Sequence, residues 1–163
     1  MKKIFYAVLI IFIFGAVNFS EARIFYAENN VWRGEVSTNE NFAEEVLKYV
    51  NIEREKVGLK SLKLNGSLNQ SADIRVKEIV TKFSHTRPNG KSPFTVVKIS
   101  YRTVGENIAA GQRSPKAVVD AWMNSEGHRE NILNPNFQYL GVGYLNAPET
   151  DYKNYWVQLF TGL

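Results

Sequence analysis

The absence of cysteine is the feature that most constrains how this chain can fold. None of its 163 residues is a cysteine, so disulfide-stapled scaffolds, thiol nucleophiles and cysteine-ligated zinc sites are excluded. Apolar residues make up 44% of the chain and charged residues 22%, which is typical of a globular domain and not of a disordered chain. The folded state must therefore be held together by a hydrophobic core, and the length suits one domain.

The first 22 residues predict an export signal that is not part of the fold. Met1-Lys2-Lys3 is a short basic start, residues 4–19 are almost entirely apolar, and Ser20-Glu21-Ala22 matches a signal-peptidase site. A retained anchor is the alternative, but the apolar stretch is shorter than the about 20 residues that a spanning helix needs. We expect residues 1–22 to be removed and residues 23–40 to form a leader segment. The mature protein is then secreted or held in a bacterial cell envelope, with no stable membrane span.

An amphipathic segment predicts a helix at the start of the domain. Residues 42–57 place apolar side chains at helical spacing, with charged side chains on the other face. Asn39 or Asn41 is expected to cap the start of this helix. Gly58 followed by Leu59 is typical of a helix end, where glycine adopts a left-handed conformation.

A second helix is expected to begin with the capping-box pattern Ser67-Leu68-Asn69-Gln70 and to end near Ser84. The residues that follow, Arg87-Pro88-Asn89-Gly90, are typical of a turn. One apolar stripe runs along this helix and consists of Leu68, Ala72, Val76, Ile79, Val80 and Phe83.

Beyond the turn, short helical patterns alternate with β-rich runs. Ser114-Pro115 is a helix start, with proline at the first helical position, and the last two β-rich runs suit an antiparallel pair. Helices covering a small sheet predict an α+β domain. The expected elements are a short helix at 92–97, a strand at 104–110, helices from 114 and at 128–133, and strands at 140–145 and 155–161.

Four polar residues stand in otherwise structural surroundings. His85 and His128 are the only histidines, so any imidazole chemistry must use them. Glu106 shares a strand face with apolar residues, so its carboxylate must be paired, ligated or opened to a cleft. Glu126 lies two residues before His128. The structural alternatives are hydrogen-bonded imidazoles, a backbone anchor at Glu106 and a solvated loop acid at Glu126.

Four motifs in this order resemble the bacterial branch of the CAP superfamily, which comprises cysteine-rich secretory proteins, antigen 5 and pathogenesis-related 1 proteins. The resemblance covers about residues 41–163, which we interpret as a CAP (SCP) domain. The motifs are Phe83-Ser84-His85-Thr86-Arg87-Pro88-Asn89-Gly90, Gly105-Glu106-Asn107-Ile108-Ala109, Ala121-Trp122-Met123-Asn124-Ser125 and Gly127-His128-Arg129-Glu130-Asn131-Ile132-Leu133-Asn134-Pro135.

The resemblance implies a three-layer α-β-α sandwich with a small, largely antiparallel sheet. It also implies a cleft in which two histidines and two glutamates can hold a divalent metal, commonly zinc. Carried over by position, the metal ligands are His85, Glu106 and His128. The family's second glutamate falls at Ser125, so Glu126 either substitutes for it in the cleft or points elsewhere.

Three functions follow as hypotheses. The first is a secreted binding or interaction module that holds a divalent metal, a lipid, a peptide or a cell-envelope component. The second is a metal-assisted extracellular hydrolase, although the chain has no His-Glu-x-x-His helix and no Gly-x-Ser-x-Gly elbow. Ser84 and Ser125 are candidate nucleophiles that no spacing favours, so catalytic residues stay unassigned. The third is an envelope protein with a vestigial site.

The expected cofactor is Zn²⁺ or another divalent cation, bound reversibly and not required for folding. A ligand set without thiolate and with an open position is typical of exchangeable zinc. The net charge is +4, but the basic residues are scattered among acids. We therefore expect no nucleic-acid partner.

Overall fold

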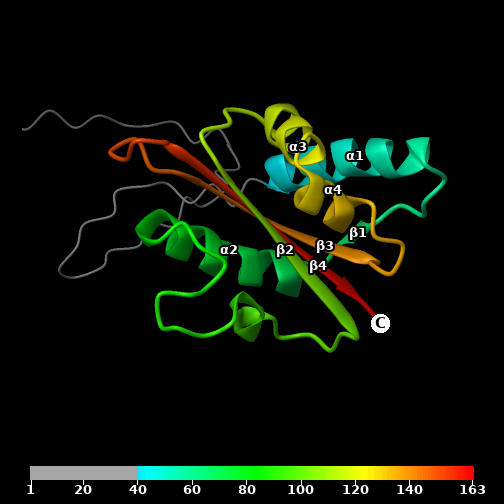
Figure 1. Ribbon diagram of the computed structural model, residues 1–163, viewed down its shortest axis with the longest axis horizontal. Coiled ribbons are helices and arrows are strands. Elements are labelled where there is room, and N and C mark those ends of the chain that lie inside the picture. Colours follow the sequence, from blue (N-terminus) through cyan, green and yellow to red (C-terminus); the bar gives the residue numbers. More distant parts are fainter. Residues whose placement is uncertain (1–39) are drawn as a thin grey trace, which may run out of the picture.

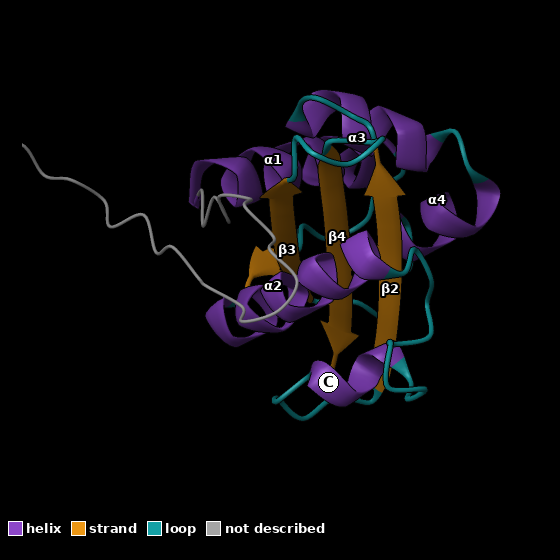
Figure 2. Cartoon of the chain, turned by 90° about the vertical axis from the view of Figure 1, so that its left-hand side faces the viewer, coloured by secondary structure: helices purple, strands orange, loops and turns teal. Residues whose placement is uncertain are grey.

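The computed structural model describes residues 40–163, which form three layers around one sheet. Helices α1, α3 and α4 cover one face of the sheet and α2 covers the other (Figures 1 and 2). The order along the chain is α1 (Glu40–Lys56), β1 (Lys63–Leu64), α2 (Gly66–Thr81), the 3₁₀ helix η1 (Pro93–Val96), β2 (Thr103–Ala110), α3 (Pro115–Met123), α4 (Glu126–Ile132), β3 (Tyr139–Asn146) and β4 (Asn154–Gly162). The predicted three-layer α+β class is confirmed, whereas the predicted signal and leader up to residue 39 lie outside the described residues.

The sheet has the strand order β1-β3-β4-β2. The predicted pairing of the last two strands is confirmed, because β3 and β4 are antiparallel neighbours. Strand β2 pairs antiparallel with β4, and only the two-residue β1 pairs parallel, with β3. The sheet is thus largely antiparallel, and β2 lies at one edge of it.

Successive side chains of β4 point to opposite faces, so this central strand contributes to two hydrophobic cores. Trp156 and Phe160 pack with α1, α3 and α4, whereas Val157 and Leu159 pack with α2. All four side chains are fully buried. The fold therefore has a hydrophobic core on each side of the sheet, and neither core contains a disulfide.

Two glycines of β3 allow α2 to approach the sheet closely. A Cβ atom at Gly143 would lie 2.5 Å from the carbonyl oxygen of Ala72, and one at Gly141 would lie 2.4 Å from that of Leu68. Real side chains do not tolerate such distances, so both positions require glycine.

The end of α1 follows the prediction. Gly58 has a φ of +73°, and the amide of Leu59 donates to the carbonyl of Arg54. At the other end, α1 begins at Glu40, the last residue of the predicted leader. Asn41 therefore lies within the helix and is not its cap, and Asn39 lies outside the described residues.

The predicted bounds of α2 were wrong at both ends. The side chain of Asn65 caps the helix by accepting from the amide of Leu68, so Ser67 lies inside the first turn. The helix ends at Thr81, and Phe83 is 51% exposed. The start was misplaced because Asn65, two residues before Ser67, caps a helix equally well. The end was misplaced because the apolar pattern continues to Phe83, which lies beyond the helix.

The outer edge of β2 is covered by side chains of the neighbouring helices. The amide of Asn131 donates to the carbonyl of Glu106, and the indole of Trp122 donates to that of Ile108. These bonds satisfy groups that would otherwise be open to another strand. Within residues 40–163, no helix is long and apolar enough to cross a membrane.

Candidate functional site

The candidate site is built around β2, because this strand alternates between the two layers of helices. Glu106 points to the same side as Ile108, which packs in the core with α2. Asn107 points to the other side, where it bonds α4. Two adjacent residues of one edge strand can therefore hold groups from both layers.

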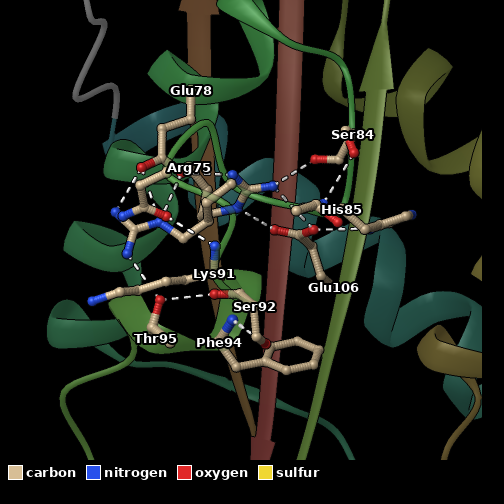
Figure 3. Close-up of polar contacts among 12 residues, drawn as sticks. Arg75, Glu78, Ser84, His85, Lys91, Ser92, Phe94, Thr95 and Glu106 are labelled. Carbon is tan, nitrogen blue, oxygen red and sulfur yellow. Dashed lines mark hydrogen bonds and ion pairs between the residues drawn. The ribbon is translucent and has the colours of Figure 1, made fainter.

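The carboxylate of Glu106 is held by Arg75 of α2 and by His85 of the loop that follows this helix (Figure 3). Arg75 donates from Nε to Oε2 at 2.7 Å and from Nη2 to Oε1 at 3.3 Å. The Nδ1 atom of His85 lies 2.8 Å from Oε1. The side chains of Arg75 and Glu106 are 0% and 1% exposed, whereas that of His85 is 58% exposed. An exposed imidazole thus rests on a buried ion pair.

A chain of alternating charges extends from this pair and fastens the loop that carries His85 (Figure 3). Arg75 also bonds the carboxylate of Glu78 and the carbonyl of Ser84. Glu78 in turn binds Arg87 at 2.6 Å. Burial acts to raise the pKa of Glu78, but the bonds and charges of Arg87 and Arg75 outweigh it, so the pKa lies below its ordinary value. The loop is therefore attached to α2 on both sides of His85.

His128 lies in α4, on the other side of β2. Its backbone carbonyl accepts a bond of 3.1 Å from the side-chain amide of Asn107, and its Nδ1 lies 2.9 Å from the hydroxyl of Ser125. Burial lowers the pKa of His128, and its electrostatic interaction with His85 lowers the pKa further. The two imidazoles are thus within electrostatic reach of each other.

A buried amide network supports the His128 half of the site. Asn131 donates to the side-chain oxygen of Asn107 at 2.8 Å, and Asn107 donates to that of Gln158 at 3.0 Å. Gln158 is fully buried in β4. Asn107 thus links α4 to the sheet through both Asn131 and the backbone carbonyl of His128.

The four residues predicted from the sequence are not all equivalent in the structure. His85 and Glu106 are in direct contact, and His128 lies across the strand edge from them. Glu126 is the first residue of α4 and is exposed. Among the described residues, it makes no hydrogen bond or ion pair with the other three.

The donor atoms that remain free are imidazole nitrogens. In both histidines Nδ1 is engaged, and Nε2 has no partner among residues 42–163. Both oxygens of Glu106 already accept bonds from Arg75 or His85. No group of three or more His, Asp or Glu side chains in the described part of the chain is placed to hold a metal ion. The donor atoms that these residues leave available are therefore the Nε2 atoms of the two histidines, whereas the oxygens of Glu106 are engaged.

A serine-histidine-acid relay is not assembled from either candidate serine. The hydroxyl of Ser84 accepts from the amide of Thr86 within its own turn. Ser125 contacts His128, but within residues 42–163 no carboxylate bonds the ring of this histidine. Nucleophilic catalysis needs both a base and a group that orients the base.

Sequence reasoning missed Arg75, although a signal for it is present. Arg75 lies three residues after Ala72 and four before Ile79, on the apolar stripe of the helix. A charged residue on a buried face needs a partner of opposite charge. Glu106, on the apolar face of its strand, needs such a partner for the same reason.

Comparison with known proteins places these motifs in one family. Residues 47–160 match the CAP family, described as the cysteine-rich secretory protein family. The protein YkwD of Bacillus subtilis is 46% identical over 126 residues, which span 74% of this chain and 47% of YkwD. The membrane protein YlbC of the same organism is 29% identical over 117 residues, spanning 69% of this chain and 33% of YlbC. The chain thus spans less than half the length of either relative.

Solved structures show the same fold. An extracellular SCP-domain protein of Bacillus anthracis superposes with a TM-score of 0.65 at 29% identity, covering 76% of this chain and 41% of that one. An outer surface protein of Borrelia burgdorferi gives a TM-score of 0.69 at 23% identity, covering 79% and 98%. By sequence and by fold, this chain belongs to the CAP family, although it has none of the cysteines that the family's description names.

Proposed function

We propose that this chain is an extracellular binding module whose ligand is held by His85 and His128. The observation that carries the proposal is the asymmetry of His85. One ring nitrogen is fixed on the buried carboxylate of Glu106, and the ring itself is 58% exposed. A side chain that is rigidly held and open to solvent is suited to binding.

Binding is favoured over hydrolysis by what surrounds the two rings. Ser125 donates to or accepts from His128 without an acid behind the ring, and Ser84 is bonded within its own turn. Neither serine is therefore paired with a base that an acid orients, whereas the two imidazoles need no such arrangement to hold a ligand.

The ligand proposed for the two rings is a divalent metal ion, with zinc as the first candidate. Neutral imidazole nitrogen is a common zinc ligand. His85 and His128 would hold the ion through Nε2, with Glu106 supporting His85 from behind. A bound zinc would act as a Lewis acid that takes up an oxygen atom of a further ligand. The two hydrophobic cores lie on either side of the sheet, so the fold does not depend on the ion.

An extracellular location is supported by the relatives and by the sequence. The Bacillus anthracis and Borrelia burgdorferi proteins carry the words extracellular and outer surface in their descriptions. The basic and apolar start of this chain is typical of an export signal. A protein in this location meets free metal ions and cell-envelope components.

Isothermal titration of the purified, metal-free protein with zinc chloride at pH 7.5 tests the proposal. We expect saturable binding by the native protein and by the Glu126→Gln variant. The double variant His85→Ala/His128→Ala should bind no zinc. Equal binding by the native protein and the double variant would contradict the proposal, and no binding by any variant would favour the vestigial site.

A further inference from the structure

We propose that Arg75 is a positioning residue that keeps the carboxylate of Glu106 away from the bound ligand. The site then offers imidazole nitrogen and withholds carboxylate oxygen. The choice of ligand in this inference rests on the proposed function. The effect of the Arg75–Glu106 pair on His85 is independent of any metal.

The first step of the argument is the geometry of the ion pair. The guanidinium of Arg75 meets both oxygens of Glu106, at 2.7 and 3.3 Å. Such a fork of two parallel contacts restrains the plane of the carboxylate. In Figure 3 the arginine lies on one side of the carboxylate and His85 on the other. Glu106 is thus clamped between a permanent cation and the imidazole.

Burial prevents the carboxylate from leaving this position. Both side chains are almost completely excluded from solvent, and removing one partner of a buried ion pair leaves an uncompensated charge. Arg75 is itself held by Glu78 and by the carbonyl of Ser84. A metal ion that recruited Glu106 directly would have to break this arrangement.

The second step concerns the proton of His85. The carboxylate only accepts hydrogen bonds, so the bond of 2.8 Å requires the proton to be on Nδ1. In the neutral ring Nε2 then carries the lone pair. A carboxylate behind a histidine fixes the ring orientation and tautomer in the same way at many metal sites.

The third step is the class of metal that such a site selects. Imidazole suits zinc, nickel and copper, whereas calcium, magnesium and manganese prefer carboxylate, carbonyl and water oxygens. Because Arg75 occupies the carboxylate of Glu106, we infer selection for the nitrogen-preferring metals. In the part of the chain that the structure describes, no acidic side chain is placed to bind a metal ion together with both histidines.

The test of the first consequence is the tautomer of His85 in the metal-free protein, measured by ¹⁵N NMR of the histidine rings at pH 8. The native protein and a control variant, Arg102→Gln at the exposed residue before β2, should both carry the proton on Nδ1. In the Glu106→Gln variant, the new amide oxygen faces Arg75 and its NH₂ group faces His85. The proton should therefore move to Nε2. A native ring protonated on Nε2, or an unchanged tautomer in Glu106→Gln, overturns the positioning role.

The test of the second consequence is a titration with zinc, nickel, manganese and calcium. The native protein should bind zinc and nickel at least 100-fold more tightly than manganese and calcium. The Arg75→Gln variant, checked for folding by circular dichroism, frees the carboxylate of Glu106. It should reduce the ratio of zinc affinity to manganese affinity at least tenfold. The Arg102→Gln variant should leave this ratio unchanged. If the Arg75→Gln variant does not fold, the inference is tested by the metal selectivity of the native protein and by the tautomer of His85 in the Glu106→Gln variant.

Native binding of manganese within tenfold of zinc contradicts the inference. Absence of any metal binding overturns the proposed function together with the selectivity. The tautomer measurement then still decides whether Arg75 and Glu106 orient His85, so the two failures are distinguishable.

Discussion

Glu106 and Asn107 are consecutive residues of β2 whose side chains face opposite layers, and each holds one of the two histidines. Glu106 bonds the ring of His85 from the α2 side, and Asn107 bonds the backbone of His128 from the α4 side. A single strand therefore supports two histidines that are 43 positions apart in the chain. A slip of β2 by one residue would exchange the two faces and separate the histidines from their supports.

Arg54 links the end of α1 to the end of α4, and its loss should destabilise the fold. This buried side chain donates to the carbonyls of Lys60, Ile132 and Asn134 at 2.7–2.9 Å. The Arg54→Met variant keeps the apolar length but leaves these carbonyls without their donor. We expect a loss of about 3 kcal/mol in the free energy of unfolding by urea. The exposed Arg113→Met control should change it by less than about 0.5 kcal/mol, and an equal effect of both variants would contradict the role of Arg54.

Gly143 and Gly127 form a matched pair for alanine substitution. A methyl group at Gly143 would meet the backbone of Ala72, whereas one at Gly127 in α4 meets nothing within 4 Å. Gly143→Ala should therefore destabilise the protein by about 1–3 kcal/mol. Gly127→Ala should stabilise it by about 0.5–1 kcal/mol, because alanine favours the helix. Thermal unfolding measures both, and a neutral Gly143→Ala would show that α2 does not approach β3 so closely.

Asp73 of α2 should make the stability of the protein depend on pH. Burial raises the pKa of Asp73 to about 6, against the opposing charge of Lys77. The folded state therefore binds the proton more tightly than the unfolded state, whose carboxyl titrates near 3.8. The contribution of this group to stability falls as the pH rises from about 4 to about 6 and is then constant.

The Asp73→Asn variant removes this dependence. At pH 8 it should be more stable than the native protein by on the order of 2 kcal/mol. At pH 3.5 the two proteins should unfold at nearly the same urea concentration. A variant that is less stable than the native protein at pH 8 would show that Asp73 makes a favourable contact as a charged group.

The elements of the fold could be predicted because their signals are local. The spacing of apolar residues, the glycine at 58 and the pair Ser114-Pro115 each act over a few residues, and the structure confirms the helices and strands that they indicated. The prediction of where α2 begins was wrong because Asn65 and Ser67 are both suitable caps, and only the packing of the helix selects between them.

The candidate site was only partly predictable because its bonds are not local. His85, Glu106 and His128 were identified by type and motif. The sequence left open whether Glu106 is paired, ligated or open to a cleft, and its partner Arg75 lies 31 positions away. Asn107 and Asn131 lie inside the recognised motifs, but their bond to each other depends on how α4 packs on β2. Such pairings follow from tertiary structure, to which a single sequence gives little access.

Export can be tested on the natural producer or a related host. The basic start, the apolar stretch and Ala22 predict cleavage before Arg23. Mass spectrometry of the extracellular fraction should therefore detect a peptide that begins at or near Arg23. Recovery of the protein only from membranes, with Met1 or Lys2 still at its N-terminus, would favour the retained anchor.

The most direct test of the site is a crystal structure of the zinc-loaded protein. We predict one zinc ion with Nε2 of His85 and Nε2 of His128 at about 2.0–2.1 Å. Water should fill the remaining positions, and the bonds of Glu106 to Arg75 and to Nδ1 of His85 should be kept. A zinc ion bound directly by an oxygen of Glu106, with the bond to Arg75 broken, would contradict the account, as would a zinc ion that contacts neither histidine.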